Sequence, residues 1–162
     1  MQLDAPQGPV FFGEFDLSID EKNRLLVPSE VRKLFDPVRD GKTLFMIIGT
    51  NNVPWFYPKP YYTRLAFQVP ADMNPSEAQL IYDRMSFAGA NEIDWDKQGR
   101  VLIPDKTLRR TKIGKTVTLI GVRDHLELWA RDSWEAYQET FEQRAEIALQ
   151  AKKARQAPMP SA

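Results

Sequence analysis

Residues 11–34 read FFGEFDLSIDEKNRLLVPSEVRKL, and residues 87–110 read FAGANEIDWDKQGRVLIPDKTLRR. The two stretches align without a gap at an offset of 76 residues, which places Asp20 on Asp96, Arg24 on Arg100 and Pro28 on Pro104. Further on, the match resumes at an offset of 72. Such a pattern indicates an internal duplication of a unit of about 55–60 residues. Two copies are too few for a solenoid, so we expect a pseudo-symmetric pair that shares one core.

The same order of elements is predicted in each copy. Alternating polarity predicts a strand over residues 15–19, and a turn follows at 21–23 or 97–99. Asn23 and Gly99 precede the two arginines, and both residue types tolerate positive φ. The other expected strands are 24–27, 100–103, 43–48, 55–57, 117–120 and 126–129. The expected helices are 28–35, 104–111, 74–87 with Asn74 and Glu77 as its capping pair, and one long final helix capped by Asp132. We expect the basic tail from Lys152 to be disordered.

Composition excludes several classes of protein. Of the 162 residues, 43% are hydrophobic and 27% charged, which is typical of a globular chain. The absence of cysteine excludes disulfides, a catalytic thiol and cysteine-bound metals, and the single histidine excludes a multi-histidine zinc site. The longest apolar run, 44–49, is far shorter than the roughly 20 residues of a spanning helix. Together with the lack of a signal-peptide pattern, this predicts a cytoplasmic protein without a membrane partner.

Catalytic signals are weak throughout the sequence. No nucleophile elbow, Walker loop or dinucleotide fingerprint occurs. His125 lies in a polar segment, 123–125, where we expect an ordinary surface residue in a turn. Asp20 and Asp96 would suit the carboxylate pair of a small hydrolase, but an arginine four residues after each would keep both ionised. We therefore expect no enzyme, no catalytic residue, no metal and no cofactor.

The repeated Asp-x-x-x-Arg pattern admits two interpretations. In the first, each carboxylate only supports a hairpin tip, and the protein is a non-enzymatic oligomeric scaffold that holds a protein partner. In the second, the duplicated tips present Arg24 and Arg100 on one face. A guanidinium held by a carboxylate has a fixed direction, which suits guanine in a major groove or a phosphate. A β-ribbon fits that groove as well as a helix does.

Local charge favours the second interpretation. The chain as a whole is neutral, with 22 basic and 22 acidic residues. Between residues 97 and 115, however, Asp105 is the only acid, and the net charge is +7 − 1 = +6. The basic residues of this stretch are Lys97, Arg100, Lys106, Arg109, Arg110, Lys112 and Lys115. A neutral chain that concentrates positive charge beside its second tip is typical of a nucleic-acid surface.

These motifs together resemble a known family. The duplicated Asp-x-x-x-Arg tip, each followed by apolar residues and proline, is similar to the MraZ proteins, which are built from two SpoVT–AbrB-type units. The sequences FAGA (87–90), GVRDHLELW (121–129) and WEAY (134–137) fit the same family. The likeness covers about residues 11–140. The first copy departs from the pattern at Asn23, where the family has glycine, and at Tyr62, where tryptophan is usual.

The resemblance implies a fold and a domain organisation. It implies a β-rich α+β fold, with two pseudo-repeated swapped-hairpin units (AbrB-like or double-psi-barrel-like) around one core and with peripheral helices. The expected division is a first repeat (11–65), a connecting helix region (66–86), a second repeat (87–137), and a C-terminal helix with a disordered basic tail (138–162).

A function and its residues are also implied. Proteins of this family regulate transcription of the bacterial cell-division and cell-wall gene cluster, and they bind repeated sites on double-stranded DNA as ring-shaped homo-oligomers. On this resemblance Arg24 and Arg100 contact DNA, Lys22 and Lys97 contact phosphates, and Asp20 and Asp96 orient the arginines. The expected location is the nucleoid within the cytoplasm.

Overall fold

The structure, a computed structural model, describes residues 7–156. Its strands are β1 (Glu14–Ser18), β2 (Arg24–Leu26), β3 (Thr43–Ile48), β4 (Pro54–Pro58), β5 (Asn91–Asp94), β6 (Arg100–Leu102), β7 (Thr116–Val122) and β8 (His125–Ala130). Its helices are α1 (Ser29–Arg32), the 3-10 turn η1 (Thr50–Asn52), α2 (Lys59–Phe67), α3 (Glu77–Phe87), α4 (Asp105–Thr111), α5 (Arg131–Gln138) and α6 (Phe141–Gln156). Two compact units result, one ending at Ala130 and one beginning at Arg131. The finer division predicted from the repeat stays a prediction.

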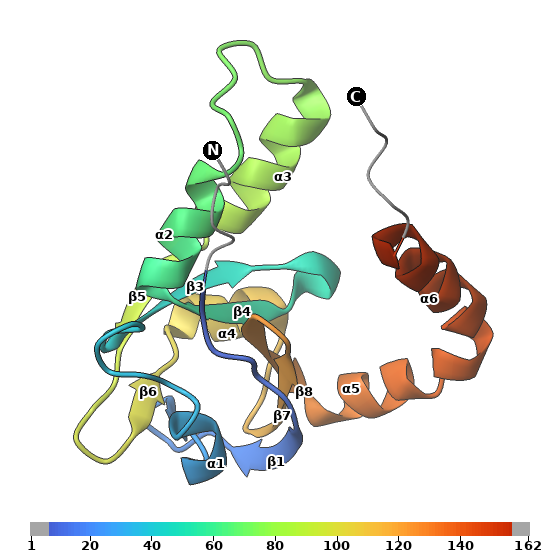
Figure 1. Ribbon diagram of the computed structural model, residues 1–162. Coiled ribbons are helices and arrows are strands. Elements are labelled where there is room, and N and C mark those ends of the chain that lie inside the picture. Colours follow the sequence, from blue (N-terminus) through green and yellow to red (C-terminus); the bar gives the residue numbers. More distant parts are fainter. Residues whose placement is uncertain (1–6, 157–162) are drawn as a thin grey trace. The chain divides into compact units, whose positions relative to one another are not determined.

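Six strands form one antiparallel sheet in the order β1-β7-β8-β4-β3-β5 (Figure 1). When each strand is replaced by its counterpart in the other copy (β1 by β5, β3 by β7 and β4 by β8), the result is the same order read from the opposite edge. The first strand of each copy therefore pairs with the third strand of the other copy. This exchange confirms the predicted swapped, pseudo-symmetric β-rich α+β fold.

The remaining strands, β2 and β6, pair with each other in a separate two-stranded sheet. Leu25 lies opposite Val101, and the flanking pairs are Arg24 with Leu102 and Leu26 with Arg100. Backbone hydrogen bonds continue beyond the strands, from Val27 N–H to the Gly99 carbonyl (3.1 Å) and from Ile103 N–H to the Asn23 carbonyl (2.8 Å). Each tip is thus bonded to the strand that leaves the other tip.

The main hydrophobic core draws on both copies. Leu25 and Val101, at the centre of the β2–β6 ribbon, are 1% and 2% exposed. They pack with side chains from the large sheet, among them Met46 and Leu128. Because the core is built from side chains of both copies, the apolar residues of each copy are buried partly by the other. The shared core predicted from the repeat is confirmed.

The α2 helix was not predicted, because Pro58 and Pro60 conceal its start. It packs with β3 and β4, where Tyr57 and Tyr61 are buried in a second, smaller apolar cluster. Figure 1 shows α2 and α3 on the same side of the sheet, and the rings of Tyr62 and Phe87 connect them at 6.2 Å. No helix in residues 7–156 is long and apolar enough to cross a membrane.

Four predicted helix boundaries were wrong. The cap of α3 is Ser76, with Gln79 as its reciprocal partner. The backbone N–H of Asn74 donates to the side chain of Asp72, so it does not serve the predicted cap with Glu77. The α1 helix ends early, at Arg32, and the chain tightens into three-residue turns up to Phe35. Pro28 and Pro104 both precede their helices in extended conformation rather than starting them.

The final helix is two helices. Thr140 bonds back to the Tyr137 carbonyl through both its amide and its hydroxyl, which closes α5 before α6 begins. Asp132 lies inside α5 and not at its cap. The apolar face predicted for one helix instead forms a ring cluster of Trp134, Tyr137 and Phe141 across the break. The α6 helix continues through Gln156, past Lys152, and the rest of the predicted tail lies outside the described residues.

His125 is not the surface residue that its polar neighbours suggested. It begins β8 and is 7% exposed, because it stacks on Trp55 with the rings 4.3 Å apart. Its Nδ1 lies 2.8 Å from Asp124 Oδ1, and its Nε2 lies 3.0 Å from Glu127 Oε1. The indole N–H of Trp129 donates to the second oxygen of Glu127. The imidazole is therefore a buried bridge between two carboxylates.

Burial by itself lowers the pKa of His125, but the hydrogen bonds to Asp124 and Glu127 outweigh it and hold the pKa above its ordinary value. Burial raises the pKa of Asp124, and the hydrogen bonds from His125 and Tyr61 outweigh that effect, so the net shift is downward. Both shifts favour the charged pair. The bridge is thus held together by charge as well as by stacking.

We predict that stability decreases with rising pH near neutrality. Because the folded pKa of His125 exceeds the unfolded value of about 6.5, its contribution is complete below about pH 6.5 and is lost as pH rises through the folded pKa. His125 is the only histidine, so His125→Gln should flatten this slope. Denaturant unfolding between pH 6 and 9 measures it. Equal slopes for the two proteins would contradict the prediction.

Candidate functional site

The first tip is organised by one carboxylate. Asp20 Oδ1 accepts hydrogen bonds from the backbone amides of Lys22 and Arg24, both at 2.9 Å. Its Oδ2 accepts from Arg24 Nε at 2.7 Å. Asn23 closes the turn with φ 60°, the left-handed conformation predicted from its side chain. The carboxylate therefore shapes the loop and holds the guanidinium at the same time.

The second tip repeats these bonds. Asp96 Oδ1 accepts from the amides of Gln98 (2.8 Å) and Arg100 (2.9 Å), and Oδ2 accepts from Arg100 Nε at 2.6 Å. Gly99 takes the left-handed position with φ 80°. The duplication seen in the sequence is thus reproduced bond for bond.

Both aspartates are ionised at neutral pH. Backbone hydrogen bonds, with the arginine bonds next, lower the pKa of Asp20 and of Asp96. Each carboxylate serves its own tip. This arrangement does not suit a pair of acids that share a proton, which was the hydrolase alternative.

The β2–β6 ribbon brings the two arginines to one face. Residues that alternate along paired strands share a face, so Arg24, Leu26, Arg100 and Leu102 lie on one side, and Leu25 and Val101 lie on the other. The inward pair is buried in the core, whereas Leu26 and Leu102 are 52% and 58% exposed. The two arginine side chains are about a third exposed, at 32% and 28%. Diagonal neighbours on such a ribbon lie about 7–8 Å apart.

The arginine forks remain available at their ends. Only Nε of Arg24 and of Arg100 bonds to the tip carboxylate, and within residues 7–156 no hydrogen bond or ion pair engages their terminal amino groups. Each tip therefore aims a cation whose direction is set by the aspartate and whose donors are free. Such a group is able to donate charge-assisted hydrogen bonds to an acceptor outside the protein.

Lys22 and Lys97 are exposed on the same tips but at different positions. Lys22 is the second residue after Asp20, whereas Lys97 is the first after Asp96. The two lysines are therefore not equivalent under the duplication. Their positions on exposed tips are compatible with the predicted phosphate contacts, which stay a prediction.

The basic stretch 97–115 divides into several structural roles. Arg109 pairs with Asp105 on α4 at 2.9 Å, and Arg110 donates to the Met85 carbonyl at 3.0 Å. Lys115 donates to the Asp20 carbonyl at 2.9 Å and to Asn23 Oδ1 at 3.2 Å. Part of the positive charge near the second tip thus supports the fold.

Sequence reasoning missed the role of Lys115. This residue belongs to the second copy but fastens the tip of the first, 92 and 95 residues away. No local pattern announces such a contact, because it depends on the exchange between copies. The Asn23 side chain, which replaces a glycine, provides one of its acceptors.

Several known proteins are similar in sequence to this chain. Residues 86–157 match the family model described as "MraZ protein, putative antitoxin-like". "Transcriptional regulator MraZ" of Clostridium tetani (strain Massachusetts / E88) is 33% identical over 140 residues, which cover 85% of this chain and 95% of the relative. The protein of the same name from Clostridium acetobutylicum is 30% identical over 131 residues, 81% of this chain and 89% of the relative. That of Desulforamulus reducens is 30% identical over 141 residues, 85% and 96%.

We predict that Lys115→Met loosens the first tip and leaves the second tip unchanged. Loss of two hydrogen bonds from a cation should raise amide exchange at residues 22–24 by roughly two- to tenfold. Hydrogen–deuterium exchange followed by mass spectrometry measures it. The control is Lys112→Met, which removes the same charge from a side chain with no hydrogen bond or ion pair in the described part of the chain. Equal exchange at 22–24 in both variants would contradict the role of Lys115.

Proposed function

The chain belongs to the MraZ family, and from this we propose that it is a sequence-specific DNA-binding regulator of transcription that contacts DNA through its two hairpin tips. One observation carries the proposal: β2 pairs with β6, so that Arg24 and Arg100 occupy one exposed face of a two-stranded ribbon. An antiparallel ribbon is narrow enough to enter a major groove.

In this proposal each guanidinium binds a guanine edge or a phosphate with its free terminal amino groups. Asp20 and Asp96 are positioning residues, because they bond to Nε and leave those groups outward. Exposed ion pairs of this type contribute little to stability. These ion pairs fix the direction of the planar guanidinium group. A fixed direction is required for the guanidinium to recognise a base edge. Lys22 and Lys97 add phosphate contacts that carry no sequence information.

The two leucines of the ribbon face are part of the same proposed surface. Leu26 and Leu102 present exposed apolar surface beside the oriented arginines. The C5-methyl group of thymine is the apolar feature of the major groove. Leu26 and Leu102 would therefore read thymine beside the guanines read by Arg24 and Arg100.

Assembly into a ring that binds repeated sites is the finer part of the proposal. One ribbon offers few base contacts, and linked ribbons on spaced repeats bind far more tightly through effective concentration. The surface formed by the end of α2, by α3 and by the segment between them supports self-association, because it exposes apolar side chains. These side chains are Phe67, Met73, Ile81, Tyr82, Met85 and Phe87. We further propose that the protein acts on the nucleoid in the cytoplasm, at the division and cell-wall gene cluster, and that it is not an enzyme.

We predict that Arg100→Ala weakens binding to DNA fragments selected by the purified protein. One lost bidentate contact corresponds to about 1–3 kcal/mol, or roughly 5- to 150-fold in affinity. The matched control is Arg109→Ala, which removes the same charge from an exposed residue of α4. Electrophoretic mobility shifts over a range of salt measure both. If the purified protein retains no DNA, and Arg100→Ala lowers only the melting temperature, the scaffold alternative is supported instead.

We predict that Leu102→Ala removes sensitivity to the thymine methyl group. Replacing thymine by deoxyuridine in the selected site should weaken the wild-type protein, and it should weaken Leu102→Ala much less, because the methyl partner is already gone. Leu149→Ala, at a similarly exposed leucine of α6, is the control and should keep the sensitivity. If the wild type and Leu102→Ala respond equally to deoxyuridine, Leu102 does not contact thymine.

A further inference from the structure

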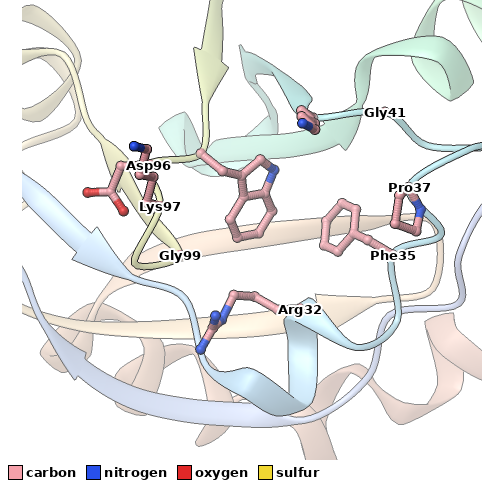
Figure 2. Close-up of a pocket in the computed structure, with 9 residues that line it drawn as sticks. Arg32, Phe35, Pro37, Gly41, Asp96, Lys97 and Gly99 are labelled. Carbon is pink, nitrogen blue, oxygen red and sulfur yellow. The ribbon is translucent and has the colours of Figure 1, made fainter.

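A cleft of about 640 Å³ lies beside the second tip (Figure 2). Arg32 and Phe35 reach it from the first copy, and Asp96, Lys97 and Gly99 from the second tip. Pro37, Gly41, Lys42 and Trp95 complete the lining. Its volume lies within the range of small-molecule sites.

The cleft coincides with the place where the two copies differ in length. The offset between the copies falls from 76 to 72, so the first copy has 76 − 72 = 4 extra residues. They fall in the loop 36–42, which supplies Pro37, Gly41 and Lys42 to the cleft. The equivalent loop in the second copy, 112–114, is correspondingly short.

The inserted loop is rigidly built. Asp40 is 1% exposed and accepts from the Asp36 amide (2.7 Å) and from both Nε and Nη2 of Arg39 (2.8 Å each). Asp36 in turn accepts from the amides of Val38 and Arg39. The cleft wall therefore has a defined shape.

The first tip has different neighbours. Lys115 donates hydrogen bonds to the Asp20 carbonyl and to Asn23 Oδ1 there. At the offset of 76, Ile19 stands in place of Trp95, Leu108 in place of Arg32, and Thr111 in place of Phe35. The aromatic and cationic lining is thus specific to the second tip.

Aromatic rings form the inner wall. Phe35 and Trp95 meet edge to face, with centroids 5.0 Å apart and planes at 79°. Phe35 also contacts Phe11, which is 1% exposed, so the pair is anchored in the core. Both rings are only partly buried and present apolar surface to the cleft.

Cations line the rest of the cleft. Arg32 is positioned by a hydrogen bond from its Nε to the Val27 carbonyl at 3.0 Å. Within residues 7–156, no ion pair engages Arg32, Lys42 or Lys97. Asp96 is the one acidic lining residue, and both its oxygens are already bonded within the tip. The lining carries +3 − 1 = +2.

We propose that this cleft binds a small anion that carries a flat aromatic ring, of about the size of a mononucleotide. The ring packs against Phe35 and Trp95, and the anionic group meets the three cations. Duplex DNA does not fit this description. It presents phosphates, but its bases are stacked and paired inside the helix, away from any aromatic wall on the protein surface.

The bound anion would touch the tip that carries Arg100. Trp95 and Asp96 are consecutive, and Trp95 bridges to Val101 across the base of the hairpin. Occupancy of the cleft therefore couples directly to the second tip. This consequence for DNA rests on the proposed function, whereas binding of the anion does not.

Isothermal titration calorimetry of the full chain, without DNA, tests the site. The probes are adenosine 5′-monophosphate and benzoate, with adenosine and inorganic phosphate as single-component arms. We expect a ring-bearing anion to bind at least about tenfold more tightly than adenosine or phosphate alone. Lys42→Gln should weaken that binding by about tenfold. Lys33→Gln, an exposed lysine next to Arg32 that does not line the cleft, should leave it unchanged.

Several results would overturn the proposal. Lack of saturable binding by both ring-bearing anions would do so, as would phosphate binding as tightly as the nucleotide. Weaker DNA binding by Lys42→Gln in the absence of small ligand would assign the cleft to the DNA surface instead. If the wild type binds the anion but binds no DNA, the proposed function is contradicted and the anion site is still supported.

Discussion

The pairing of β2 with β6 is the contact on which the rest of the structure depends. Each strand has only three residues and would not be stable alone, since an isolated short hairpin is marginal in water. It becomes stable because Leu25 and Val101 lie opposite each other and seal the shared core. The bonds from Val27 to Gly99 and from Ile103 to Asn23 extend the pairing into both tips. One contact therefore unites the two copies, closes the core and places both arginines on the same face.

The aspartate–arginine pairs act within this frame as orienting devices. Their side chains are about a third exposed, where ion pairs contribute little to the free energy of folding. The same carboxylates accept two backbone amides each, so they define the loop before they hold the guanidinium. Each tip thus combines a backbone held by its aspartate with an arginine whose terminal amino groups are free to donate.

The duplication is symmetric in its backbone and asymmetric in its surroundings. The first tip is fastened by hydrogen bonds from Lys115. The second tip borders a cleft opened by a loop of the first copy. The two arginines therefore occupy equivalent positions but different environments, which allows the two tips to be influenced separately.

From the sequence alone, the repeat predicted the strands, the shared core and the two left-handed residues before the arginines, because alternation and turn chemistry are local. It could not locate the α3 cap, the break before Phe141 or the buried position of His125, because each depends on competing hydrogen bonds or on rings that pack from elsewhere. Only the tertiary structure decided that Lys115 of the second copy bonds to the first tip. It also decided where the four extra residues open a cleft. The exchange of strands brings together residues some 60 to 95 positions apart, and no local pattern encodes such partners.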